Sequence, residues 1–163
     1  MDILIRQVKE EDLDAVTRVE AVCFPEAEAA TRDSFSQRIH TFAESFFVAE
    51  KNGEIIGFIN GCVTDRKTIC DEMFEDAAYH MPDGPYQSIF GLDVVPEYQH
   101  QGLASRLMRH LIEDARAKGR KGLILTCKDR LIGFYETFGY RSMGVSASVH
   151  GGAVWYDMIL DFE

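Results

Sequence analysis

Apolar residues recur along this chain with two periods, one helical and one alternating, and their succession predicts an α/β (α+β) fold. An apolar stripe with acids in its first turn predicts a helix over 10–23, and Gly119 ends a longer helix over 101–118. Asn52-Gly53 between two apolar runs is typical of a hairpin turn. Shorter helices are expected over 31–41, 71–78 and 131–138, and strands over 2–8, 45–50, 54–63, 86–95, 122–127, 140–143 and 153–161. Because helices and strands alternate around one mixed sheet, we expect three layers.

The pattern contains no internal repeat, linker or low-complexity segment, so we expect a single domain over 1–163. A chain of 163 residues, 46% of them hydrophobic, buries about 70% of the surface that its unfolded form exposes. It can therefore build a core without disulfides or metals.

The net charge narrows the choice of partners. Seventeen Lys and Arg against 27 Asp and Glu give −10 with histidine neutral. Such a deficit argues against nucleic acid and anionic membranes as partners, because phosphate groups attract clustered cations. It favours a cationic small molecule instead. We expect no nucleic-acid or membrane partner, and a monomer or homodimer.

The N-terminal residues and the cysteines suggest a compartment. Residues 1–6 contain no basic segment followed by a long apolar one, and no window reaches the roughly 18 apolar residues of a membrane helix. The four cysteines are dispersed, which favours reduced thiols. We therefore expect a cytoplasmic protein. The five histidines have no metal-ligand spacing, so no metal is assigned.

A strand–turn–helix segment over 92–104 carries the sharpest local signal. Its helix begins at Gly102-Leu103-Ala104, where small residues let a ligand approach the backbone and the free amides of the first turn point at an anion. A phosphorylated cofactor is therefore compatible with an acidic chain. The alternative is that Gly102 and Ala104 only permit tight packing of strand on helix.

Two motifs add a family resemblance. Gln99-x-x-Gly102-x-Ala104 resembles the acetyl-coenzyme A motif of the GNAT superfamily of N-acetyltransferases, and 134–140 resembles the segment that these proteins carry on their last helix. The stretches 127–140 and 80–84 are similar to the arylalkylamine (serotonin) N-acetyltransferase branch. The resemblance extends over about 3–160.

The resemblance implies a single GNAT N-acetyltransferase domain and its acyl-CoA N-acyltransferase fold. This fold has a mixed, mostly antiparallel sheet of six to seven strands, splayed at the central strand 86–95 and flanked by about four helices. Acetyl-CoA is the implied cosubstrate, with its pantetheine arm paired to that strand and its pyrophosphate on the backbone amides of 99–105. The residues so assigned to coenzyme A are Leu92, Asp93, Val94, Gln99, His100, Gln101, Gly102, Leu103, Ala104, Ser105, Phe134 and Tyr135.

The implied reaction is direct attack of a primary amine on the thioester in a ternary complex. With an amine pKa of roughly 10.4, only about one molecule in 10³ is neutral at pH 7. The amine proton must therefore be removed, and the departing thiolate must gain one. The resemblance makes Tyr135 the general acid; the alternative is that its ring only packs the last helix.

The general base is where this sequence departs from the family pattern. The two histidines of the serotonin enzyme correspond here to Ser88 and Phe90, and the Glu of histone-modifying relatives is also missing at Ser88. We expect a water relay with His80 as the catalytic base; the alternative is a plain surface-loop histidine. The candidates are His80, Glu26, Glu28 and Asp93.

The resemblance places the acceptor site under the loop over 24–32, whose acids favour a cationic amine; the alternative is a solvated acidic loop. The residues assigned to the substrate are Phe24, Pro25, Ser88 and Phe90. A small arylalkylamine or alkylamine fits best, with apolar and cation–π contacts to aromatic rings. Two alternatives remain open: a non-catalytic acyl-CoA sensor that lost its base, and a protein-modifying acetyltransferase.

Overall fold

The computed structural model describes residues 2–162, whose nine strands form two sheets. The first sheet is antiparallel throughout, in the order β1-β2-β3-β6. Its strands are β1 (Leu4–Gln7), β2 (Phe46–Lys51), β3 (Glu54–Asn60) and β6 (Gly91–Val94). Asn52 and Gly53 both have positive φ at the β2–β3 hairpin, as the predicted turn requires.

The second sheet has the order β4-β5-β7-β9-β8 and one parallel pair, β5 with β7. Its strands are β4 (Val63–Thr64), β5 (Tyr86–Ile89), β7 (Gly122–Cys127), β8 (Arg141–Val145) and β9 (Tyr156–Asp161). The mixed, mostly antiparallel arrangement predicted from the sequence is confirmed. The described strands exceed the expected six to seven because two predicted strands are each divided.

Both divided strands lie where the sheets part. The strand predicted over 86–95 is interrupted at Phe90, so that β5 belongs to one sheet and β6 to the other. The strand predicted over 54–63 is divided after β3, where a Cβ on Gly61 would overlap the Ser88 carbonyl. The chain therefore crosses between sheets twice at the same place, and this produces the splay.

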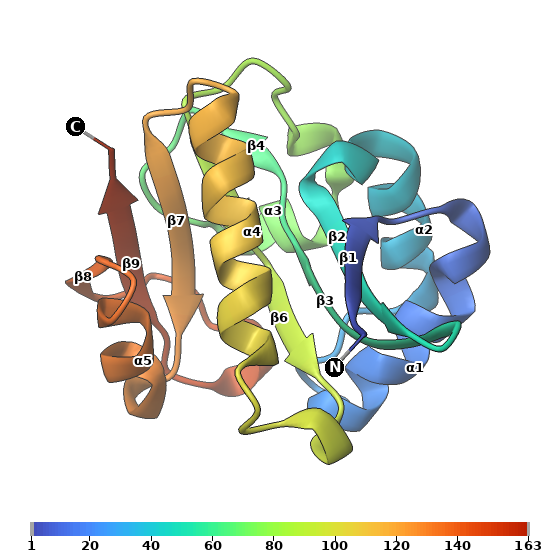
Figure 1. The fold of residues 1–163 in the computed structure, drawn as a ribbon. Coiled ribbons are helices and arrows are strands. Elements are labelled where there is room, and N and C mark those ends of the chain that lie inside the picture. The colour runs from blue at the N-terminus through green and yellow to red at the C-terminus, as the bar shows by residue number, and fades with distance from the viewer. Residues whose placement is uncertain (1, 163) are drawn as a thin grey trace.

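The helices cover the two faces of the sheets. They are α1 (Leu13–Cys23), α2 (Arg32–Phe42), α3 (Asp71–Glu75), α4 (Leu103–Ala117) and α5 (Ile132–Glu136). Short 3₁₀ turns occupy Glu10–Asp12, Ala43–Ser45, Ala77–Tyr79, Pro96–Tyr98, Asp129–Leu131 and His150–Gly152. Figure 1 shows α4 lying along β6 and β7, while α1 and α2 cover β1–β3 from the other side. Three layers result, as predicted.

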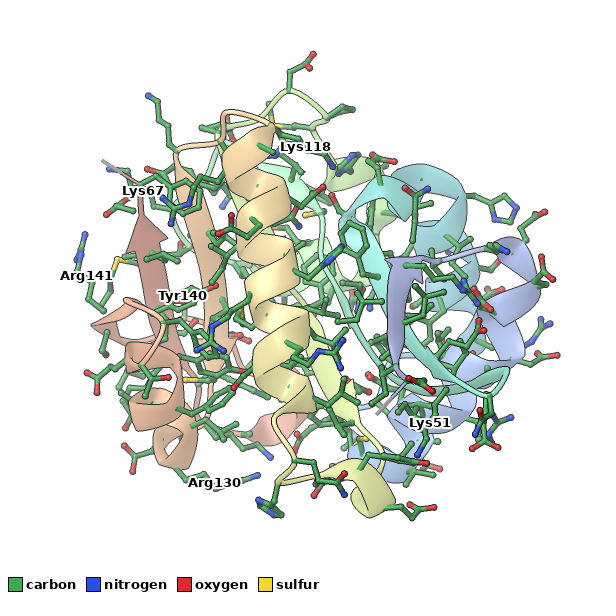
Figure 2. The ribbon with its side chains drawn as sticks, viewed as in Figure 1. Lys51, Lys67, Lys118, Arg130, Tyr140 and Arg141 are labelled. Atoms are coloured by element: carbon green, nitrogen blue, oxygen red, sulfur yellow. The ribbon has the colours of Figure 1, made fainter. Side chains whose placement is uncertain are left out.

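The long helix α4 supplies the main core because its apolar stripe faces the sheets. Leu107, Met108 and Leu111 are fully buried there, and Gly119 follows with φ +75°, which confirms the predicted helix end. Figure 2 shows Arg141 on β8 and Lys51 at the β2–β3 hairpin on opposite sides of the molecule. Within residues 2–162, no helix has both the length and the apolar character needed to traverse a bilayer.

Candidate functional site

A cavity of about 280 Å³ opens where the two sheets part. Leu92 of β6 lines one side and Leu125 and Cys127 of β7 line the other, while α1, α2 and α5 close it. Beyond β3, β6 has no other strand paired to it among the described residues, so one of its edges is available to a ligand. The cavity therefore lies against the strand edge predicted to hold the pantetheine arm.

An anion cradle lies at the start of α4. The backbone amides of 102–105 donate to no oxygen of the described chain, and the first helical bond there runs from Arg106 N to Gly102 O (3.1 Å). Gly102 has φ +85°, and nothing lies within 4 Å of where its Cβ would stand. Tight strand–helix packing therefore does not explain Gly102. The position needs a left-handed backbone with open space in front of it.

The preceding turn holds the cradle in place through side chains. Gln99 Nε2 donates to Val94 O (2.9 Å), and Gln101 Nε2 donates to Glu97 O (3.1 Å). The backbone amide of Gln99 donates to Pro96 O, so it is not one of the free amides. His100 adopts a positive φ of 62° and is exposed. Leu103, Ala104 and Ser105 carry the free amides.

Tyr135 lines the cavity from α5, and burial together with the nearby Cys127 and Asp93 raises its pKa well above the usual value. Its hydroxyl is therefore protonated at neutral pH, as a proton donor must be. Phe134 does not line the cavity; its ring packs against Tyr135 and Phe138, with centroids 5.1 and 5.2 Å away. Phe134 thus supports α5 rather than facing the ligand.

Aromatic rings also line the cavity. Phe24 and Phe90, both assigned to the substrate from the sequence, do so with Phe74 and Trp155. Pro25 is exposed and outside the lining. This aromatic part of the wall suits an apolar or aromatic body, and we call it the acceptor end because the sequence assigns Phe24 and Phe90 to the acceptor.

Two sequence assignments are corrected. Ser88 is fully buried away from the cavity, where its hydroxyl donates to Cys62 O (2.8 Å). His80 is also outside: its Nδ1 accepts from Val63 N (3.0 Å) and its Nε2 lies 3.2 Å from Glu44 Oε1. Both ring nitrogens of His80 are occupied, and burial lowers its pKa, so the histidine is a neutral structural group.

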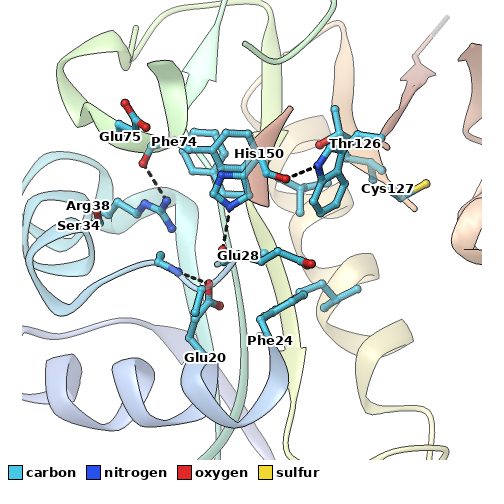
Figure 3. A pocket seen from close by; sticks show the side chains of 18 of the residues that line it. Glu20, Phe24, Glu28, Ser34, Arg38, Phe74, Glu75, Thr126, Cys127 and His150 are labelled. Carbon is cyan, nitrogen blue, oxygen red and sulfur yellow. Dashed lines mark hydrogen bonds between the residues drawn. The ribbon is translucent and has the colours of Figure 1, made fainter. Parts of the chain in front are cut away.

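Two loops close over the acceptor end and contact each other. Lys128 Nζ pairs with Glu28 Oε2 (2.8 Å), and His150 Nε2 lies 2.8 Å from Glu28 O, as Figure 3 shows for the histidine. His150 also stacks on Phe74, with the two rings 10° from parallel. Glu28, a candidate base from the sequence, is therefore held by Lys128. The contacts reduce access to the cavity from outside.

A buried group of charges lies beneath the acceptor end. Glu20 of α1 lines the cavity, and Asp93 of β6 is 1% exposed beside it. Burial and the charge of Glu20 raise the pKa of Asp93 well above its usual value, so Asp93 keeps its proton. Arg38 of α2 donates to Asn60 Oδ1 (3.1 Å), and burial lowers its pKa to about 10, which leaves it charged at pH 7.

Asp93 does not line the cavity, although the sequence places it among the coenzyme A residues; it pairs with Phe58 of β3 instead. Glu20 and Arg38 were missed from the sequence. The available signal was a charged residue on the buried stripe of each helix: Glu20 follows Val19 on α1, and Arg38 precedes Ile39 on α2. In the described part of the chain, no three His, Cys, Asp or Glu side chains gather as metal ligands.

Comparison of the sequence with known proteins identifies a family and several similar proteins. Residues 13–140 match the sequence profile of the Acetyltransferase (GNAT) family. The chain is 29% identical over 132 residues to the probable hydrolase YhcX of Bacillus subtilis (strain 168), covering 76% of this chain and 25% of that protein. It is 27% identical over 109 residues to the serotonin N-acetyltransferase of Mesocricetus auratus, covering 66% and 51%. The chain thus spans a quarter to a half of the length of these relatives.

Among solved structures, the GphF GNAT-like decarboxylase in complex with isobutyryl-CoA has a similar fold. Its TM-score is 0.85 over 97% of this chain and 98% of that chain, at 22% identity. At that identity the likeness shows the fold alone, and it confirms the fold class predicted from the sequence.

Proposed function

This chain belongs to the GNAT acetyltransferase family, and from that premise we propose that it transfers the acetyl group of acetyl-CoA to the primary amine of a small arylalkylamine or alkylamine. The observation that carries the proposal is one cavity joining three features. They are the free edge of β6, the hydroxyl of Tyr135 and an acidic, aromatic acceptor end.

Coenzyme A fits the residues present. The free amides of 102–105 and the open space in front of Gly102 suit its pyrophosphate, and the edge of β6 at Leu92 suits the amide groups of its pantetheine arm. Bound there, acetyl-CoA supplies a thioester carbonyl as the electrophile. Backbone amides make these contacts, so the net charge of −10 does not oppose an anionic cosubstrate.

The acceptor end favours a small cationic amine. A volume of about 280 Å³ is at the low end for small-molecule sites, and Phe24, Phe74 and Trp155 offer apolar surface for an alkyl or aryl body. The Glu28 contacts with Lys128 and His150 reduce the room for a protein chain. Likeness to the hamster serotonin enzyme supports the arylalkylamine class within this range.

In the proposed reaction, Tyr135 donates its proton to the departing thiolate. Its raised pKa keeps it protonated until the thiolate forms, and Tyr135 lines the cavity that would hold the thioester. We extend the proposal to one domain over 1–163 in the cytoplasm, acting as a monomer or homodimer. Cell fractionation and light scattering test these points.

The deciding experiment measures thiol release from acetyl-CoA with phenethylamine, tryptamine and a polyamine, and the mass of the amine product. Amine-dependent release with an acetylated product supports the proposal. Release without an amine indicates hydrolysis. Coenzyme A binding without turnover indicates a sensor, and acetylation confined to a co-purified protein indicates a protein-modifying enzyme. Each of these three results contradicts small-amine transfer.

A further inference from the structure

Glu20 presents an unpaired carboxylate oxygen to the acceptor end of the cavity. The residue is 7% exposed, and its Oε2 accepts from the backbone amide of Ala30 (2.8 Å; Figure 3). Its Oε1 is buried and has no hydrogen-bond partner among the described groups. That oxygen lies near Gly91, where the central strand is interrupted: a Cβ built on Gly91 would stand 3.7 Å from it. A buried oxygen without a donor calls for one from a ligand.

Asp93, Arg38 and Cys23 lie around Glu20. Asp93, the adjacent carboxyl from β6, keeps its proton because burial and the nearby Glu20 raise its pKa. Arg38, from α2, contributes one positive charge to both carboxyls. The Cys23 thiol on α1 stays neutral because burial raises its pKa to about 12. Of these groups, Glu20 and Arg38 line the cavity, and only Glu20 of the two can accept a proton.

We propose that Glu20 is the catalytic base of this reaction: its Oε1 binds the ammonium of the acceptor amine and removes one proton. This inference rests on the proposed acyl transfer. It assigns a base that the central strand cannot supply, because Ser88 is buried away from the cavity and Phe90 has no titratable group.

The protons balance over one cycle. Glu20 takes the first proton from the ammonium, and the neutral amine then forms a C–N bond to the thioester carbonyl. When the C–S bond breaks, Tyr135 protonates the leaving sulfur. The amide nitrogen loses its second proton to the Tyr135 oxygen, and Glu20 releases its own to solvent. One ammonium and one thioester give one amide, one thiol and one proton.

The test compares Glu20→Gln with Glu11→Gln, a matched change at an exposed position just before α1. Gln keeps the size and the contact to Ala30 but binds no proton. With phenethylamine at pH 7, we expect kcat/KM to fall about 100-fold or more in Glu20→Gln and to stay unchanged in Glu11→Gln. The deficit narrows toward pH 10, because the amine then loses its proton to water.

A second amine that is largely neutral at pH 7 needs no base, so its reaction shows whether Glu20 acts as a base or only supports the structure. With β,β-difluorophenethylamine, which is far less basic than phenethylamine, the deficit of Glu20→Gln is expected to shrink at least tenfold at pH 7. An equal deficit with both amines would overturn the assignment. Asp93→Asn changes the neighbouring carboxyl and leaves Glu20 in place, so kcat/KM should stay within tenfold of wild type. A loss in Asp93→Asn as large as that in Glu20→Gln would also overturn it.

Calorimetric measurement of amine binding tests the role of Glu20 separately from acetyl transfer. Phenethylamine is titrated into each protein saturated with coenzyme A, and we expect Glu20→Gln to bind it at least tenfold more weakly with the coenzyme affinity unchanged. If wild type acetylates no amine, the proposed function fails, and this titration still decides whether Glu20 is the ammonium site. Equal amine binding by the two proteins, or none by wild type, overturns the inference while leaving any measured acetyl transfer standing.

Discussion

Gly102 and Gly119 lie at the two ends of α4 and offer a matched pair of substitutions. Both have a left-handed backbone, with φ of +85° and +75°, and no atom lies within 4 Å of where either Cβ would stand. Alanine at either position therefore meets strain without a clash. Only Gly102 belongs to the anion cradle, so only Gly102→Ala should affect coenzyme A.

The magnitudes follow from these two facts. A non-glycine residue in the left-handed region costs roughly 1–2 kcal/mol, which corresponds to a Tm lower by about 2–8 °C for a domain of this size. Both variants should show this loss. A Cβ at Gly102 also enters the space that the pyrophosphate would fill. Losing one hydrogen bond to a charged group costs about 1.5–3 kcal/mol, so coenzyme A affinity should fall about 10- to 100-fold.

Thermal unfolding and calorimetric titration with coenzyme A provide the two measurements. We expect similar Tm values for Gly102→Ala and Gly119→Ala, and weaker binding only for Gly102→Ala. If both variants bind coenzyme A like wild type, the start of α4 is not the pyrophosphate site. If both bind equally weakly, the effect comes from strain in α4 and not from the cradle.

Three further predictions concern the acid, the corrected histidine and the first helix. Tyr135→Phe should lower kcat about 100-fold without changing coenzyme A affinity or Tm, because within residues 2–162 the hydroxyl has no hydrogen-bonded partner to lose. An unchanged kcat removes Tyr135 from the reaction. His80→Asn should lower Tm, because it disturbs the contact with the Val63 amide, and should leave kcat/KM unchanged. If kcat/KM falls while amine binding stays equal to wild type, His80 is again a catalytic candidate. Burial favours a raised pKa for Asp12, but its hydrogen bonds with Arg6 (2.8 and 3.0 Å) and the Lys9 amide outweigh it and lower the pKa. These contacts therefore stabilise the fold above pH 4, and the stabilisation disappears as pH falls. The free energy of unfolding of Asp12→Asn should be about 1.5–3 kcal/mol below wild type at pH 7 and equal to wild type near pH 2. Urea titrations that show the same difference at both pH values would contradict this.

The geometry at the start of α4 could be predicted because its signals are local. A helix beginning at Gly102 leaves its first amides without partners whatever the rest of the chain does. The same holds for Tyr135, which a short motif places on the last helix. Phe134 in the same motif packs against its neighbours, so a motif match did not by itself distinguish a ligand contact from a packing contact.

The acceptor end was harder because it depends on contacts between distant segments. Strict alternation along 86–95 puts Ser88 and Phe90 on one face, but the interruption at Phe90 ends that alternation. Four consecutive residues from Ile89 to Leu92 consequently line the cavity. The loop contacts of Glu28 with Lys128 and His150 join residues more than 90 positions apart, which no local pattern reports.

The sequence by itself determined the order of helices and strands, the hairpin at Asn52-Gly53 and the free amides at the start of α4. Each of these follows from apolar periodicity or backbone preference over a few residues. Tertiary structure alone decided which acids meet. Glu20 and Asp93 come from a helix and a strand 73 positions apart, and only their burial side by side raises the pKa of Asp93. Their role depends on desolvation and mutual charge, which exist only once the two sheets have closed around them.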